Sequence, residues 1–155
     1  MEQLYRLLYP MRVCLITSSA DGKDNIMAAS WTFPLSAEPP MFGVSIAKKR
    51  YSYELIKKGN AFGINIPSPE LEKVMMICGR KSGRETDKFM EANLTKEGGA
   101  HVPLIKECPI SMECELVKEV ETGDHVVFVG KVIKTIKRFE SRGLYHLGGN
   151  EFTTV

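Results

Sequence analysis

Hydrophobic and polar residues alternate in short runs along most of this chain, a pattern typical of β-strands rather than long helices. An apolar run at 13–18, the turn sequence Asp21-Gly22 and a second run at 25–35 together predict a β-hairpin. After a Pro-Pro break, residues 41–46 predict a further strand, and residues 61–66 predict another. The first part of the chain is therefore expected to be mainly β.

Helix signals are confined to the middle of the chain. Residues 51–58 predict a short helix that ends at Gly59. The sequence Ser68-Pro69-Glu70 predicts a second helix start, because it combines an N-cap hydroxyl, a proline at the first helical position and an acidic residue. This second helix is expected to end near Gly79, and residues 86–92 predict one or two further helical turns.

The last third of the chain returns to strands. Residues 110–116 alternate between apolar and polar, residues 121–124 supply a turn, and residues 126–136 run back as a second long strand. One short strand is expected at 145–147. Six or seven strands with helices only between them predict a mainly β fold, an antiparallel barrel with a helical insert, in one domain spanning 1–155.

Composition adds limits rather than a function. The chain has 155 residues, 43% of them hydrophobic and 26% charged, and a net charge of +2, which gives no support for binding to nucleic acid or a membrane. The start of the chain carries an acidic residue and no long apolar run. The four cysteines lie in apolar segments and show no metal-ligand spacing: Cys14, Cys78, Cys108 and Cys114. We therefore expect no metal site, and a location in the reducing cytoplasm.

Three segments are candidate binding sites. The first, Ser45 to Ser52, ends a strand with three consecutive cations and begins a helix with Ser52 as its expected N-cap. Cationic side chains, hydroxyl groups and the N–H groups of a helix start suit a phosphate monoester. A solvated charged loop with an ordinary cap would give the same pattern.

The second segment, Asn25 to Trp31, places small residues at 28–30, where the backbone could approach a flat ligand. A close-packed barrel strand is the alternative explanation. The third segment, Cys78 to Phe89, holds two glycines and four cations. It could fold over a polar ligand, form a disordered connection or end an interface.

Side chains for catalysis are few. His125 follows a turn at the start of a long strand, and neither His101 nor His146 forms a metal pattern with it. The carboxylates show no acid/base pair. An enzyme of this composition would take its chemistry from a cofactor, and a flavin suits that role.

Taken together, these segments resemble the flavin reductase-like family of FMN-binding split-barrel proteins, which includes flavoredoxin and archaeal ferric reductases. The matching stretches follow the family's order over almost the whole chain: Asn25 to Trp31, Pro34-Leu35-Ser36, Pro39-Pro40, Ser45 to Ile56, Gly59 to Pro67, Cys78-Gly79 to Phe89, Gly123-Asp124-His125 with Gly130, and Leu147-Gly148-Gly149. The chain departs from the family at Pro10-Met11-Arg12-Val13, where many members have a Pro-Arg-Pro-like sequence.

The resemblance implies a homodimer of antiparallel split β-barrels with FMN near the subunit interface. The FMN phosphate would lie against the segment Ser45, Ile46, Ala47, Arg50, Tyr51 and Ser52. The ring and ribityl chain would follow Met27, Ala28, Ala29, Ser30 and Trp31. The loop with Gly79, Ser82, Gly83 and Lys88 would close the site, with Lys88 as a positive charge near the ring. His125 would lie near the nicotinamide of a reductant.

The implied activity is NADH- or NADPH-dependent reduction of FMN, with electrons passed to free flavin, ferric iron or a partner protein. Two alternatives stay open. One is a flavoredoxin-like electron carrier without NAD(P)H activity, which would meet other redox proteins through its basic rim. The other is a non-enzymatic module that binds FMN or another phosphorylated ligand.

Overall fold

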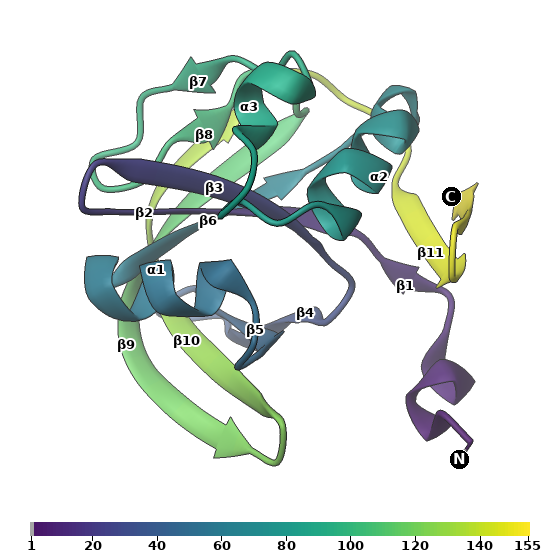
Figure 1. Cartoon of the computed structure of the whole chain (residues 1–155), viewed down its shortest axis with the longest axis horizontal. Helices are drawn as coiled ribbons and strands as arrows, with labels where there is room; N and C mark the ends of the chain where they lie inside the picture. Colours follow the sequence, from purple (N-terminus) through teal and green to yellow (C-terminus); the bar gives the residue numbers. More distant parts are fainter. Residues whose placement is uncertain (1) are drawn as a thin grey trace.

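A seven-stranded antiparallel sheet organises the chain in the computed structural model, which describes residues 2–155 (Figure 1). Its strand order is β3-β2-β6-β9-β10-β5-β4. The strands are β2 (Cys14–Ala20), β3 (Lys23–Ala29), β4 (Thr32–Ser36), β5 (Met41–Ala47), β6 (Ala61–Ile66), β9 (Ile110–Thr122) and β10 (His125–Lys137). The expectation of a mainly antiparallel β fold is confirmed.

Two smaller sheets and five short helices complete the fold. The sheets join β1 (Met11–Arg12), β11 (Leu144–Gly148) and β12 (Glu151–Thr154), and β7 (Lys96–Glu97) with β8 (Leu104–Ile105). The helices are η1 (Leu4–Leu8), α1 (Tyr51–Gly59), η2 (Pro69–Leu71), α2 (Glu72–Arg80) and α3 (Lys88–Glu91), where η marks a 3-10 helix. Within residues 2–155, no helix is long and apolar enough to cross a membrane.

The main sheet curls around one apolar core. Residues from six of its strands pack together there with Ile56 of α1, including Ile16, Val44, Phe62 and Phe128. Strand pairing nevertheless leaves β3 and β4 as the two ends of the sheet in the described residues, so the pairing does not close a barrel. The predicted hairpin is present: β2 pairs with β3 across Asp21-Gly22, and both turn residues have positive φ, 52° and 75°.

Strand β2 is buried on both faces, which explains the unbroken apolar run that it shows in sequence. Ile16 points into the curled sheet, whereas Leu15 belongs to a second core that also holds Met75 of α2 and Phe89 of α3. The helical insert therefore covers the outer side of β2 and β3, as Figure 1 shows for α2 and α3. This packing places the end of α2 beside β3, where the candidate site lies.

Several predicted boundaries need correction. The run 25–35 is two strands, β3 and β4, separated at Ser30-Trp31. The second helix begins as η2 and continues as α2 to Arg80, past the expected end at Gly79. The helix η1 and the short strands β1, β7, β8 and β12 were not predicted. Gly59 is the last residue of α1, and Asn60, with φ 56°, is the left-handed residue. A Cβ at Gly59 would lie 2.2 Å from the Ser19 carbonyl oxygen, so close backbone approach explains this glycine.

The alternation in β9 is present, but two of its polar members, Ser111 and Glu113, are buried rather than exposed to solvent. Glu113 is fully buried and accepts hydrogen bonds from the backbone N–H groups of Ala100, His101 and Val102 at 2.8, 2.6 and 3.1 Å. These hydrogen bonds fasten the loop between β7 and β8 to the sheet. Burial opposes ionisation of Glu113, but the three backbone donors prevail and hold its pKa below the usual value.

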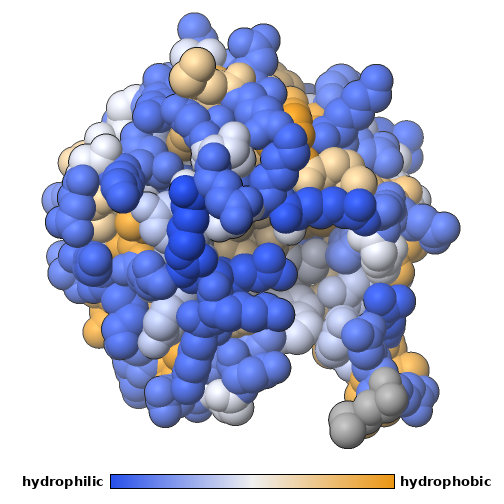
Figure 2. All heavy atoms as spheres, in the orientation of Figure 1, coloured by the Kyte–Doolittle hydropathy of each residue, from blue (hydrophilic) through white to orange (hydrophobic). Residues whose placement is uncertain are grey.

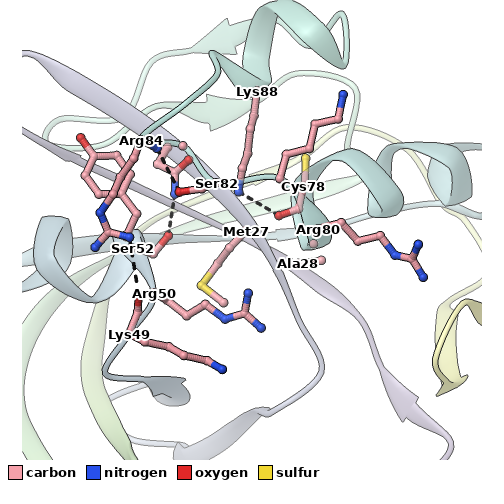
Figure 3. A pocket seen from close by; sticks show the side chains of 15 residues that line it. Met27, Ala28, Lys49, Arg50, Ser52, Cys78, Arg80, Ser82, Arg84 and Lys88 are labelled. Atoms are coloured by element: carbon pink, nitrogen blue, oxygen red, sulfur yellow. Dashed lines mark hydrogen bonds between the residues drawn. The ribbon is translucent and has the colours of Figure 1, made fainter.

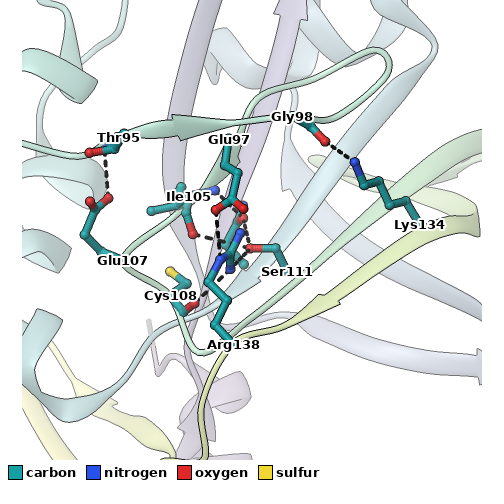
Figure 4. A network of polar contacts seen from close by, with 10 residues as sticks. Thr95, Glu97, Gly98, Ile105, Glu107, Cys108, Ser111, Lys134 and Arg138 are labelled. Atoms are coloured by element: carbon teal, nitrogen blue, oxygen red, sulfur yellow. Dashed lines mark hydrogen bonds and ion pairs between the residues drawn. The ribbon is translucent and has the colours of Figure 1, made fainter.

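A second polar network, centred on Arg138, holds the chain segment between α3 and β9 (Figure 4). The Arg138 guanidinium pairs with Glu97 at 3.0 Å and donates to the Cys108 carbonyl oxygen at 2.8 Å and to Ser111 Oγ at 3.0 Å. Ser111 Oγ in turn donates to Asn65 Oδ1 at 2.7 Å. The irregular segment between α3 and β9 is thus held by one buried and three partly buried hydrogen bonds.

Candidate functional site

Two adjoining pockets lie where α1, the end of α2 and strand β3 meet. The first, here called the cation pocket, has a volume of about 200 Å³, and the second, here called the aromatic pocket, about 560 Å³. They share the lining residues Met27, Ala28, Lys49, Arg50, Gly79 and Arg80. In Figure 2, hydrophilic side chains gather around a hollow on this face of the molecule. The two pockets therefore form one continuous site with unlike halves.

Positive charge dominates the cation pocket (Figure 3). Six cationic residues line it, and its lining within residues 2–155 contains no carboxylate: Lys49, Arg50, Arg80, Lys81, Arg84 and Lys88. Arg84 pairs with Glu54 and Lys81 with Glu91 at the rim. In the described part of the chain, Lys49 and Arg50 take part in no ion pair. Such a pocket suits an anion with several oxygen atoms.

The start of α1 adds uncharged donors to this pocket. Arg50 is the N-cap residue, so the prediction that Ser52 caps the helix is wrong. Ser52 is the second residue of α1, in its first turn, where its backbone N–H has no acceptor within the helix. Asn25 Nδ2 donates to Ser52 Oγ at 2.9 Å. Because Asn25 occupies the oxygen of Ser52 as an acceptor, the Ser52 hydroxyl proton is available to a ligand.

The loop after α2 lies against α1. Ser82 Oγ accepts from the Arg84 N–H at 3.2 Å, and the Arg84 guanidinium lies 5.0 Å from the centre of the Tyr51 ring. A Cβ at Gly83 would lie 2.1 Å from Asn25 Oδ1, so only glycine allows this approach. The loop covers one side of the cation pocket.

Lys88 joins the site to the helical insert. Its side chain is buried, and its ammonium donates to the carbonyl oxygens of Ile26 at 2.7 Å and Cys78 at 3.0 Å (Figure 3). Burial lowers the pKa of Lys88 to about 8, with a smaller contribution from the charge of Arg50. The Lys88 side chain thus lines the cation pocket while its hydrogen bonds fasten α3 and the end of α2 to β3.

The buried cysteines, by contrast, have little nucleophilic character. Burial raises the pKa of Cys14 and Cys78 to about 11 and that of Cys114 to about 12. All four cysteines are free and buried, as their apolar surroundings predicted. Cys78 lines the cation pocket as a neutral thiol.

Rings form the walls of the aromatic pocket. Six aromatic or imidazole side chains line it in a connected series: Phe152, His146, Tyr9, Tyr5, Trp31 and His125. Neighbouring ring centres in this series lie 4.7 to 6.0 Å apart. Trp31 Nε1 donates to the Tyr9 hydroxyl at 3.3 Å. Flat walls of this kind suit a flat ligand.

His125 stands at the edge of this pocket with one defined hydrogen bond. Its Nδ1 lies 2.7 Å from Asp124 Oδ1, and because a carboxylate only accepts, Nδ1 carries a proton. This hydrogen bond lowers the pKa of Asp124. The ring of His125 lies 4.7 Å from that of Trp31. Nε2 of His125 is therefore the nitrogen free for a ligand.

All sixteen residues named from the sequence line one or both pockets, so the structure brings the three candidate segments together. Ala29 also belongs to the core, and Ala28 lies next to Gly79, where a Cβ would be 3.3 Å from that of Ala28. The small residues of β3 thus serve close packing as well as the pocket wall. Their contact with a cofactor stays a prediction.

Sequence reasoning missed several lining residues. Asn25, Lys49, Arg80 and Arg84 lie within the candidate segments but were not singled out, although their side chains are polar or charged. The aromatic residues from the chain ends gave no local signal, because only the fold carries them to β3: Tyr5, Tyr9, His146 and Phe152.

Comparisons with known proteins agree on one family. The model of the flavin reductase like domain matches residues 4–151. A ferric-chelate reductase (NAD(P)H) of Archaeoglobus fulgidus is 28% identical over 135 residues, which cover 85% of this chain and 78% of that protein.

Two solved structures are also closely similar. A flavoredoxin of Methanosarcina acetivorans has a TM-score of 0.86 at 30% identity, covering 96% of this chain and 86% of that one. An FMN-binding protein of Thermus thermophilus, with bound 1-cyclohex-2-enone, has a TM-score of 0.90 at 26% identity. The match covers 99% of this chain and 91% of that one.

Proposed function

Because the chain belongs to the flavin reductase-like family, we propose that it is an oxidoreductase that binds FMN and is reduced by NADH or NADPH. The observation that carries this proposal is the junction of a cation pocket without carboxylates and a pocket walled by rings. FMN has two parts that match these pockets, a phosphate that suits the cation pocket and a flat ring system that suits the aromatic pocket. Related proteins described as FMN-binding support the choice of cofactor.

The residues of the cation pocket fit a phosphate by their chemistry. Arg50 and Lys49 supply unpaired positive charge, and Ser52 supplies a hydroxyl donor that Asn25 orients. The first turn of α1 adds N–H groups and the positive end of the helix dipole. We expect Arg50 and Ser52 to touch the phosphate directly, while Lys48, which pairs with Glu121 at 3.1 Å, points elsewhere.

The aromatic pocket would receive the flavin ring along the end of β3 and the two residues that follow it, from Met27 to Trp31. When bound, the flavin supplies hydride and electron transfer, for which this chain offers no side chain of its own. The protein's part is to orient the ring, to exclude water through its aromatic walls, and to leave one face open to a second reactant. We expect His125, which lines the pocket and hydrogen-bonds Asp124 through Nδ1, to contact that reactant through Nε2.

An electron carrier is the second candidate, favoured by the similarity to a flavoredoxin. Stopped-flow mixing of the flavin-loaded protein with NADH and with NADPH separates the two. Bleaching of the flavin within seconds, slowed in His125→Ala, is the result that a reductase predicts. A flavin that stays oxidised with both nucleotides, but is reduced by a protein partner, would identify a carrier. An unchanged rate in His125→Ala would remove this histidine from hydride transfer.

We also propose that the curled sheet is a split barrel and that the protein is a homodimer. The support for the homodimer is the apolar surface that the single chain leaves exposed. Leu7 and Leu8 of η1 are 76% and 75% exposed, and Val117 of β9 and Ile133 of β10 are 55% and 44% exposed. Large apolar side chains exposed on η1 and on two paired strands support a surface that binds a protein.

A further inference from the structure

His146 reaches the aromatic pocket on the hairpin of β11 and β12. Its ring lies 5.3 Å from that of Tyr9 and stacks on Phe152 at a centroid distance of 5.3 Å and an angle of 29°. The turn of the hairpin holds Gly149 at φ 56°, a conformation that favours glycine. The Gly149 carbonyl oxygen lies 2.8 Å from His146 Nε2. Packing and this contact fix the orientation of the ring.

The two contacts of the imidazole define where its proton lies. A carbonyl oxygen only accepts, so Nε2 carries the proton and donates it to Gly149. In a neutral imidazole the other nitrogen is then an acceptor. Nδ1 lies 3.1 Å from Ser30 Oγ, at the junction of β3 and β4. Ser30 must therefore donate its hydroxyl proton to His146.

This direction decides what Ser30 offers to the pocket. A serine hydroxyl has one proton and two lone pairs, and the proton is engaged by His146. We propose that His146 is a positioning residue that holds the Ser30 hydroxyl as a hydrogen-bond acceptor in the aromatic pocket. The site would then select a ligand that places an N–H or O–H donor at this point. That the donor is an N–H of a flavin ring rests on the proposed function.

The inference on the tautomer can be tested without any ligand. Long-range ¹H–¹⁵N correlation spectra of the flavin-free protein, labelled on histidine and kept at a pH where imidazoles are neutral, identify the protonated nitrogen. We expect His146 to be protonated on Nε2. Its Nδ1 resonance should shift in Ser30→Ala and stay in place in Ser36→Ala, the matched control in β4. Protonation on Nδ1, or no shift in Ser30→Ala, would overturn the proposal.

Two substitutions of His146 distinguish its role as a hydrogen-bond acceptor from its role in packing. His146→Phe keeps a ring between Tyr9 and Phe152 but removes the acceptor, whereas His146→Asn keeps an acceptor near the position of Nδ1. We expect His146→Phe to weaken FMN binding about three- to tenfold, the effect of one lost hydrogen bond, and His146→Asn to restore most of it. His101→Phe, an exposed histidine outside both pockets, is the control and should bind like the unchanged protein.

The affinities are measured by quenching of Trp31, the only tryptophan of the chain. Unchanged affinity in His146→Phe, or equal losses in His146→Phe and His146→Asn, would contradict a role for the acceptor while leaving the proposed function intact. If the unchanged protein binds no flavin, the proposed function fails and the assignment of the donor to a flavin fails with it. The spectra of the flavin-free protein distinguish these two outcomes.

Discussion

Arg50 is the residue on which we expect phosphate recognition to depend most. It caps α1, lines both pockets and belongs to no ion pair among residues 2–155. A guanidinium can present two parallel donors to a phosphate, which a lysine cannot do. Its neighbours Lys48 and Lys49 carry the same charge but differ in geometry, because Lys48 turns to Glu121. Charge alone therefore does not identify the binding residue in the run Lys48-Lys49-Arg50.

Removal of the Arg50 charge should weaken FMN binding selectively. We expect Arg50→Gln to lose about 1.5–3 kcal/mol of FMN binding free energy, the usual contribution of a charge-assisted hydrogen bond. Riboflavin, which has no phosphate, should bind Arg50→Gln as it binds the unchanged protein. Fluorescence titration with both ligands measures the difference, and Lys48→Gln is the matched control. Equal losses for FMN and riboflavin would show that Arg50 does not contact the phosphate.

Strand β9 carries a polar residue that stabilises the fold rather than the site. Glu113→Gln should lower the free energy of unfolding by about 1–3 kcal/mol at neutral pH, because an amide replaces a buried carboxylate that accepts hydrogen bonds from three backbone N–H groups. Urea unfolding measures the difference. The exposed Glu115 in the same strand offers the control Glu115→Gln, which should unfold like the unchanged protein.

The difference in free energy of unfolding between the unchanged protein and Glu113→Gln should depend on pH. The pKa of Glu113 is lowered in the folded state, so its contribution is fully present above the usual carboxyl pKa of 4.5 and declines as the pH falls through the folded-state value. Glu113→Gln has no such titration. The stability gap between the two proteins should therefore narrow on acidification below pH 4.5. A gap that stays constant from neutral pH into this range would contradict the assigned ionisation.

At the level of elements, sequence periodicity predicted the strands of the main sheet, β11 and the helical regions in the middle of the chain, because local alternation and turn chemistry determine them. It did not predict η1, the short strands β1, β7, β8 and β12, or the break at Ser30-Trp31. Sequence periodicity also did not predict that Glu113 is buried, because only the loop packed against β9 explains a buried carboxylate at this position. The cation pocket could be foreseen from charged runs next to a helix start. The aromatic pocket could not, because Tyr9 and Phe152 come from opposite ends of the chain.

Assembly belongs to the scale of the whole molecule. If the exposed apolar side chains of η1 are covered by a second copy, light scattering after gel filtration should give twice the mass of the 17.4 kDa chain. Replacing Leu7 and Leu8 together by serine should shift this species toward the monomer. Lys57→Ser, on α1 outside both pockets, serves as a control with no expected effect. A monomeric unchanged protein at micromolar concentration would contradict the proposed homodimer.

The central claim is that the joined pockets bind FMN with its phosphate in the cation pocket. Parallel calorimetric titrations of the flavin-free protein with FMN and with riboflavin test it most directly. We predict one FMN per chain, bound at least about a hundredfold more tightly than riboflavin, since the phosphate would gain charge-assisted hydrogen bonds from Arg50 and Ser52. Equal affinity for the two flavins, or no binding of either, would contradict the claim.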